Sequence, residues 1–386
     1  MFKRTDFVLF FLIFALSIFG IVITVSANMG NPDYFSQNYL LYGYLRKSLI
    51  VLLIGFVAMV ISFALFNYKI LNLIYHPIVL VLMFTFLLLP LGFEAVGGAK
   101  AWINLGFFKL QPSEFAKTYI ILYLAQTLNV KYSTKKITSK DIIKTPIIIV
   151  ASMTFIIMIL QHDFGSAAIF FGIAFVSLLV SNQNKTVRLQ NYLTLIMILL
   201  FFVILIVFLT PFLTDFLISL DTDNYMIKRF IMASDPFLDP YDKGFQLING
   251  LVSMASGGLS GAGIGNSVRK YMNFFATSTD FVSSIIVEEL GFIGFSVFFL
   301  SYCTVILKLI LHAFRDRNST GSAILFGTAT YFFIHLLLNV GGASSLVPLT
   351  GVPLLLISEG GSAKLSAYIL IGICLKVIYL DKRRKT

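Results

Sequence analysis

Long apolar stretches run through this chain from end to end, and they limit the folds it can adopt more than any other feature. A helix needs roughly 20 apolar residues to cross about 30 Å of hydrocarbon. The chain supplies such stretches because 58% of its 386 residues are hydrophobic and only 12% are charged. Strand-period alternation of apolar and polar residues, the pattern of a membrane barrel, is not visible. The sequence therefore predicts an all-α, polytopic membrane helical bundle.

The apolar stretches predict about ten transmembrane helices in a single domain that comprises residues 1–386. Their approximate bounds are 7–26, 48–66, 70–91, 114–129, 144–160, 164–181, 192–216, 281–308, 320–340 and 353–380. An even number of spans puts both termini on one side of the membrane. The longest connection, about residues 217–280, joins the seventh helix to the eighth.

Basic residues collect on the side that holds the termini, as they do in the cytoplasmic loops of membrane proteins. They are Lys3, Arg4, Lys69, Lys131, Lys135, Lys136, Lys140, Lys144, Lys185, Arg188, Arg315, Arg317 and the tail DKRRKT. We therefore expect cytoplasmic termini and an extracytoplasmic loop at 217–280. This distribution also accounts for most of the net charge of +11, so that charge is not interpreted as a nucleic-acid surface.

Three polar stretches interrupt the apolar pattern, and the predicted topology puts all three on the outer side. The first is GGAKAWINLGFFKLQPSEFAK, residues 97–117, which contains the only tryptophan, Trp102. Its Pro-Ser-Glu segment suits a helix start, and Glu114 and Lys117 lie one turn apart on that helix. Taken alone, the stretch can also be explained without a functional site, with Trp102 as an interfacial anchor and Glu114 and Lys117 as a local ion pair.

The second polar stretch is the long loop itself. Residues 225–232 read as an interfacial amphipathic segment and residues 245–256 as a short helix. Glycines at 257, 258, 261, 263 and 265 precede Arg269 and Lys270. The amides of such a loop, with these two cations, can hold a phosphate group. A flexible hinge explains the same glycines.

The third polar stretch is SSLVPLTGVPLLLISEGGSAKLSAY, residues 344–368, in which two prolines and a Gly-Gly pair interrupt the predicted last helix. Non-helical backbone at membrane depth is tolerated only where it is buried in protein or lines water. Glu359 and Lys364 are therefore expected in a wet pocket, where they can pair with each other. Asp163 and His335 lie at a similar depth, so all four residues predict a polar cavity that opens to the outer leaflet.

Three carboxylates lie in TSTDFVSSIIVEELGFIG, residues 277–294. At helical pitch Asp280 and Glu288 share one broad face, whereas Glu289 points the opposite way and is expected to pair with a neighbouring helix. Glu288 lies roughly 12 Å deeper than Asp280 at 1.5 Å per residue, where it can line the cavity floor or pair with a basic side chain. Asp280 can act in chemistry or simply cap the eighth helix.

Polar residues alone leave two classes of function open: an enzyme that acts on a membrane-borne or external substrate, and a transporter with a site at mid-membrane. Six motifs then resemble the SEDS (shape, elongation, division and sporulation) family of bacterial cell-wall polymerases, typified by RodA, FtsW and SpoVE. They are GGAKAWINLGFFKLQPSEFAK, QHDFGSA, DPFLDPYDKGFQLING, GGLSGAGIGNS, TDFVSSIIVEELGFIG and LVPLTGVPLLLISEGGS. The short N-terminus and the lack of a long cytoplasmic tail favour the RodA-like branch.

The resemblance implies a peptidoglycan glycosyltransferase at the outer face of the bacterial cytoplasmic membrane. Such an enzyme polymerises lipid II, an undecaprenyl-diphosphate-linked disaccharide-pentapeptide, into β(1→4) glycan strands. The family's essential aspartate corresponds to Asp280, its tryptophan to Trp102, and its cavity-lining Glu and Lys to Glu114 and Lys117. The resemblance also implies a class B penicillin-binding protein, a transpeptidase, as partner.

Polymerisation inverts the configuration of the anomeric carbon, and such a reaction needs only one general base, which deprotonates the acceptor 4-hydroxyl as it attacks. Asp280 is the expected base. The leaving diphosphate requires positive charge from Lys117, Arg269, Lys270, Lys364 or a divalent cation (Mg²⁺ or Mn²⁺). The sequence contains no ligand cluster that specifies a metal, and no organic cofactor is expected. The alternative function is a flippase for the lipid-linked precursor. That function needs a polar path through the whole membrane, whereas the ionisable residues gather in its outer half.

The chain departs from the family pattern at a few positions. Ser278 stands where the family usually has His, Glu359 where Tyr is usual, and His162 where Pro is usual. The first two are expected to change how the acceptor is positioned and how the cavity is charged.

Overall fold

A computed structural model describes residues 5–30, 38–106, 109–130, 139–180, 225–242, 244–272, 274 and 276–385, together with the single positions 195, 199 and 218. The predicted seventh helix (192–216) and the basic positions 131–136 therefore fall outside the described residues, apart from Leu195 and Leu199.

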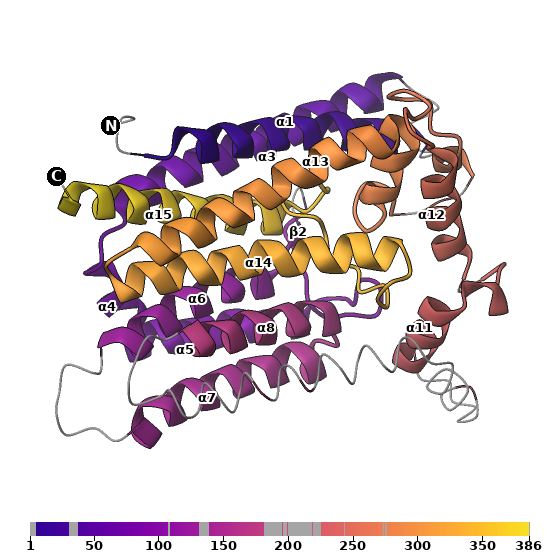
Figure 1. Cartoon of the computed structure of the whole chain (residues 1–386). Coiled ribbons are helices and arrows are strands. Elements are labelled where there is room, and N and C mark those ends of the chain that lie inside the picture. Colours follow the sequence, from indigo (N-terminus) through magenta and orange to yellow (C-terminus); the bar gives the residue numbers. More distant parts are fainter. Residues whose placement is uncertain are drawn as a thin grey trace.

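The described chain forms a bundle of helices that run side by side, with the N- and C-termini at the same end (Figure 1). The long helices are α1 (Phe7–Asn28), α3 (Asn38–Leu65), α6 (Pro112–Val130), α7 (Ser139–Phe155), α8 (Phe164–Val180), α13 (Val282–Arg315), α14 (Ser319–Ala343) and α15 (Gly361–Lys385). The shorter α4 (Ile70–Ile74) and α5 (Pro77–Leu88), followed by a 3₁₀ turn at Leu89–Gly92, make up the predicted third span. A π-helical turn at Ile156–Leu160 continues α7. The prediction of a polytopic membrane helical bundle is confirmed, and α1, α13 and α14 are among the helices long and apolar enough to cross a membrane alone.

The two helices of the long loop lie at the opposite end of the bundle (Figure 1). The predicted loop helices are present as α11 (Tyr225–Ser234) and α12 (Phe245–Ser256), with 3₁₀ turns η5 (Pro236–Leu238) and η6 (Arg269–Tyr271). Before α6, two short strands, β1 (Ile103–Asn104) and β2 (Lys109–Leu110), pair in antiparallel fashion.

The core of the bundle is built around α14, which packs against α13, α6 and α8. Small residues let these helices approach closely, since membrane helices associate through tight van der Waals packing. A Cβ at Gly327 of α14 would lie only 2.9 Å from Cγ2 of Ile121 on α6. The absence of a side chain at Gly327 therefore lets α6, which carries cavity residues, pack directly against α14.

Helix α13 is broken at Gly291, where φ is 66° and ψ is −174°. The glycine-rich loop satisfies the backbone groups that the break exposes. Phe292 N donates to Gly258 O, while Ala262 N and Gly263 N donate to the carbonyls of residues 288 and 289, each at 2.9 Å. These two loop amides are therefore engaged by α13 and are not free to hold the predicted phosphate group. The glycines instead permit close contact between two backbones.

The predicted tenth helix (353–380) is also wrong at its start, because α15 begins only at Gly361. Residues 344–360 form turns and extended backbone that fold into the end of the bundle. Proline lacks the amide that a helix requires, and Leu356 adopts a left-handed conformation with φ of 67°. The segment is fixed by other chain segments, as when Glu359 N donates to Ser278 O at 2.8 Å.

Candidate active site

A polar cavity of about 190 Å³ lies where the segment before α13, the segment before α15 and the starts of α6 and α8 meet. Six of the predicted site residues line it: Trp102, Glu114, Lys117, Asp163, Asp280 and Glu359. Gln111, Ser166, Thr279, Thr350, Gly351, Val352, Pro353 and Gly360 complete the wall. Residues from four distant parts of the sequence therefore converge on one cavity.

Asp280 is held by a tight turn rather than by the helix that follows it. The carbonyl of Ala276 (φ 57°) accepts hydrogen bonds from the amides of residues 279, 280 and 281 at 3.0–3.1 Å. The buried amide of Asn339 on α14 donates to the carbonyls of Thr279 and Asp280, both at 3.2 Å, and to that of Val352 at 3.0 Å. Helix α13 has Phe281 at its N-cap and no side-chain cap. The Asp280 carboxylate therefore does not cap this helix and faces the cavity.

The surroundings of Asp280 suit a general base. Burial in the cavity raises the pKa of its carboxyl to about 6, against the opposing effects of a hydrogen bond from Thr279 and the charge of Arg229. A base is most effective when its pKa lies near the working pH. Arg229 lies on α11, and its side chain is held in place because Nη1 donates to Leu349 O, in the segment before α15, at 2.7 Å.

Two other carboxylates that line this cavity, those of Glu114 and Asp163, already accept hydrogen bonds from neighbouring groups. Glu114 accepts from Lys117 Nζ at 2.7 Å, with both side chains buried, and from Tyr331 Oη at 2.8 Å. Asp163 accepts from Gln111 Nε2 at 2.7 Å and from the amide of Ser166 at 3.0 Å. The predicted Glu114–Lys117 ion pair is thus present, and Asp280 is the better placed of these carboxylates to receive a proton.

A second cavity of about 370 Å³ adjoins the first and shares Trp102, Glu359 and Gly360 with it. Three lysines line this second cavity, and they are Lys47, Lys109 and Lys364. Glu359 lies 3.8 Å from Lys47, and Lys364, its predicted partner, lines the same cavity within range of the Glu359 charge. A largely apolar cavity of about 490 Å³ continues between α3 and α15 and is lined by Lys47, Ile50, Ile54 and Leu365 among others.

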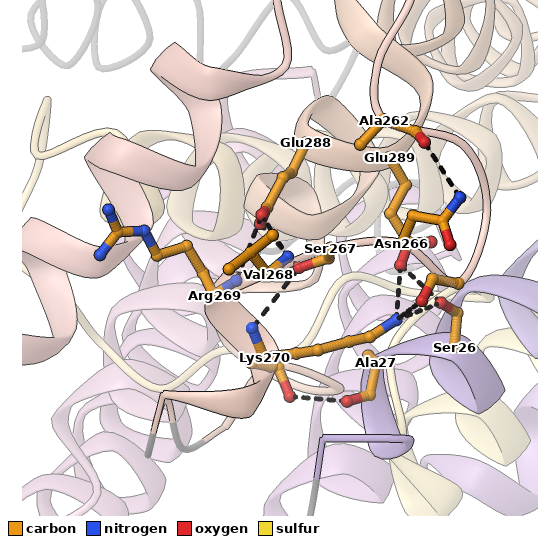
Figure 2. A network of polar contacts seen from close by, with 12 residues as sticks. Ser26, Ala27, Ala262, Asn266, Ser267, Val268, Arg269, Lys270, Glu288 and Glu289 are labelled. Atoms are coloured by element: carbon orange, nitrogen blue, oxygen red, sulfur yellow. Dashed lines mark hydrogen bonds and ion pairs between the residues drawn. The ribbon is translucent and has the colours of Figure 1, made fainter.

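Four predicted site residues do not line these cavities: Arg269, Lys270, Glu288 and His335. Figure 2 shows the first three in a separate network of polar contacts that also contains Glu289 and Ser26. Lys270 Nζ donates to Glu289 at 2.9 Å, to Ser26 of α1 at 3.1 Å and to Gly265 O at 2.7 Å.

The Glu288 carboxylate accepts hydrogen bonds from backbone amides and hydroxyl groups and does not line either cavity. It accepts from the hydroxyls of Ser253 and Ser267 and from the amides of Val268 and Arg269, which fixes η6 against α13. The prediction that Glu288 lines the cavity floor is therefore wrong. The prediction that Glu289 pairs with a neighbouring helix is confirmed, since Ser26 Oγ donates to it at 2.6 Å.

His335 is fully buried behind the cavity wall. Its Nδ1 lies 2.7 Å from Pro353 O, and its ring packs edge-on against Tyr331 with centroids 4.7 Å apart. The histidine thus supports the segment before α15 instead of facing the cavity.

Sequence reasoning missed Lys47, Lys109, Arg229 and Asn339. The lysines carried a usable signal, because they are basic residues on the side predicted to be poor in positive charge. Asn339 also carried one, as a polar amide inside an apolar span needs partners within the bundle.

A model of the family described as "Cell cycle protein", which comprises FtsW, RodA and SpoVE, matches residues 7–383. The chain is 32% identical over 405 residues to the probable peptidoglycan glycosyltransferase FtsW of Bacillus subtilis, covering 100% of this chain and 94% of the relative. A chain from a peptidoglycan synthase complex that coordinates polymerization and crosslinking matches with a TM-score of 0.72 and 24% identity, covering 98% of both chains. RodA from Thermus thermophilus matches with a TM-score of 0.61 and 22% identity, covering 98% of this chain and 97% of RodA.

Proposed function

Because this chain belongs to the FtsW, RodA and SpoVE family, we propose that it is a peptidoglycan glycosyltransferase that polymerises lipid II with Asp280 as its general base. The observation that carries this proposal is the pairing of two adjoining cavities. One contains a carboxylate poised to accept a proton, and the other contains three lysines. A transfer from a sugar diphosphate requires both features.

In the proposed reaction, the acceptor sugar lies in the smaller cavity and its 4-hydroxyl donates a hydrogen bond to Asp280. The hydroxyl oxygen attacks the anomeric carbon of the donor while its proton passes to the Asp280 carboxylate. The bond between the anomeric carbon and the diphosphate oxygen breaks, and the diphosphate leaves with the bonding electrons. Attack from the face opposite the leaving group gives the β linkage from an α-linked donor.

The diphosphate is assigned to the cavity lined by Lys47, Lys109 and Lys364, since fixed positive charge stabilises the charge that develops on the leaving group. Of the cations predicted for this task, only Lys364 lines this cavity. Lys117 is engaged by Glu114, and Arg269 and Lys270 lie in the network of Figure 2. The apolar cavity between α3 and α15 adjoins the lysines through Lys47 and suits the polyprenyl chain.

A divalent cation was a further expectation for the leaving group. Within the described residues, no three His, Cys, Asp or Glu side chains gather in a geometry that would hold a metal ion. The lysine-lined cavity also has Glu359 as its only carboxylate among its lining residues. These residues do not form a resident metal site, so no step is assigned to a metal.

The proposed orientation has both termini in the cytoplasm and the cavities at the outer face of the cytoplasmic membrane. The location of the loop helices α11 and α12 at the end of the bundle away from the basic C-terminal tail supports it (Figure 1). A class B penicillin-binding protein is the proposed partner, because the related chain belongs to a complex that combines polymerization with crosslinking. The RodA-like branch stays a prediction.

Reconstitution into liposomes that carry labelled lipid II tests this function against the flippase alternative. We expect glycan strands to form on the side to which the cavities open, with no transfer of unpolymerised lipid II across the bilayer. Transfer of intact lipid II without glycan formation, by correctly folded protein together with its partner, would refute the enzyme and support the transporter.

A further inference from the structure

Glu359 lies at the boundary between the two cavities, where it contributes a carboxylate to both. Its Oε1 is 3.8 Å from Lys47 Nζ on α3. Its Oε2 accepts hydrogen bonds from Ser278 Oγ at 3.2 Å and from Asn28 Nδ2 at 3.4 Å. One negative charge is therefore fixed at the rim of the cavity that collects three lysines.

Two departures from the family pattern meet at this point. Ser278 and Glu359 contact each other twice, through their side chains and through the 2.8 Å bond from Glu359 N to Ser278 O. Ser278 also lies two residues before Asp280, within the same turn. The Glu359 carboxylate is thus anchored to the turn that carries the proposed base.

The contact between Glu359 and Lys47 is long for an ion pair, and both side chains remain accessible, at 34% and 61% of their full exposure. An accessible pair of this kind is weak and separates readily. A phosphate group that enters the cavity can therefore take over Lys47, while the carboxylate stays on Ser278 and Asn28. The bound phosphate then faces a like charge across the rim, and like charges at short range repel.

We propose that Glu359 sets the affinity of the lysine-lined cavity for diphosphate and thereby promotes release of the polyprenyl diphosphate product. This inference rests on the proposed function, since it takes that cavity as the diphosphate site. Three lysines without a counter-charge would hold the leaving group after each transfer. The carboxylate weakens that hold while the lysines still stabilise the departing charge.

Binding of farnesyl diphosphate and of inorganic pyrophosphate to the full-length protein in lipid nanodiscs tests the inference. Removing one unit charge beside the bound phosphate is expected to tighten binding about tenfold in Glu359→Gln. Glu359→Asp keeps the charge and is expected to stay near wild type, and Glu94→Gln, at an exposed carboxylate, serves as the matched control. Glu359→Tyr, which restores the residue usual in the family, is a second neutral variant should Glu359→Gln fold poorly.

In lipid II polymerisation, Glu359→Gln is expected to complete a first transfer at the wild-type rate and then to turn over more slowly. Equal or weaker binding of both probes by the neutral variants would overturn the inference. Tighter binding of farnesyl diphosphate alone would do the same, since it would locate the effect at the lipid chain rather than at the charge.

Variants Lys47→Gln, Lys109→Gln and Lys364→Gln separate this inference from the proposed function. If they bind both probes as tightly as wild type does, the lysine-lined cavity is not the diphosphate site, and the proposed assignment itself fails. If they bind more weakly while the neutral variants at Glu359 bind no more tightly, only the role of Glu359 is refuted.

Discussion

The buried ion pair between Lys270 and Glu289 gives the sharpest test of how the end of the bundle beside α12 is held together. Both side chains are completely buried, and Lys270 Nζ makes three polar contacts that join α1, α13 and the glycine-rich loop (Figure 2). Lys270→Met keeps the length of the side chain but removes its charge. The Glu289 carboxylate then retains only the hydrogen bond from Ser26 among its described partners.

An uncompensated buried charge is costly, so Lys270→Met is expected to destabilise the protein by about 3–5 kcal/mol. The double variant Lys270→Met/Glu289→Leu removes both charges and is expected to recover most of that loss, because replacing a whole buried pair with apolar groups is often close to neutral. The cost of the single variant therefore comes from the orphaned carboxylate, and the double variant measures it.

Thermal and denaturant unfolding of the purified protein in one fixed detergent measures these differences. Lys308→Met is the control, since Lys308 pairs at 2.9 Å with Asp6 in a partly exposed site and is expected to cost far less. A Lys270→Met protein within about 1 kcal/mol of wild type, or a double variant no more stable than the single one, would refute the reasoning.

Three further predictions concern the site and its supports. The pKa of about 6 for Asp280 predicts that polymerisation slows about tenfold per pH unit below pH 6, as the base becomes protonated. Arg229→Met removes a charge that lowers this pKa and should move the acid limb to higher pH, so an unmoved limb would contradict the assignment. Asn339→Ala removes the amide that fixes the Asp280 turn and should lower kcat about tenfold or more with little change in KM, and an unchanged kcat would exclude this positioning role. Gly291→Ala should prevent correct folding, because a Cβ there would lie 2.4 Å from Gly261 N, and a normal yield of folded protein would show that the break in α13 can relax.

The sequence predicted those features that depend on solvation. Asp163 and Glu359 could be assigned to one cavity because ionisable groups in an apolar chain must face water or each other, whereas Trp102, Glu114 and Asp280 were assigned through the family resemblance. The loop helices 225–232 and 245–256 were predictable for the same kind of reason, since each has its own amphipathic pattern.

Features that depend on long-range contacts were not predictable. The periodicity of residues 277–294 assumes a continuous helix, whereas Asp280 lies in a turn before α13, which begins only at Val282 and is broken again at Gly291. Glu288 therefore faces η6 rather than the cavity. Likewise, Lys270 resembles a cavity cation in sequence, and only the fold brings it to Glu289, 19 positions away.

The central claim is that the carboxylate of Asp280 removes the proton from the acceptor hydroxyl. The most direct test compares glycan products made from lipid II by wild type, Asp280→Asn and Asp242→Asn, each purified with its transpeptidase partner at equal levels. Asp242 is an exposed carboxylate between α11 and α12, so Asp242→Asn controls for loss of charge. We predict long strands from wild type and Asp242→Asn and none from Asp280→Asn. Strands of wild-type length and rate from folded Asp280→Asn would contradict the claim.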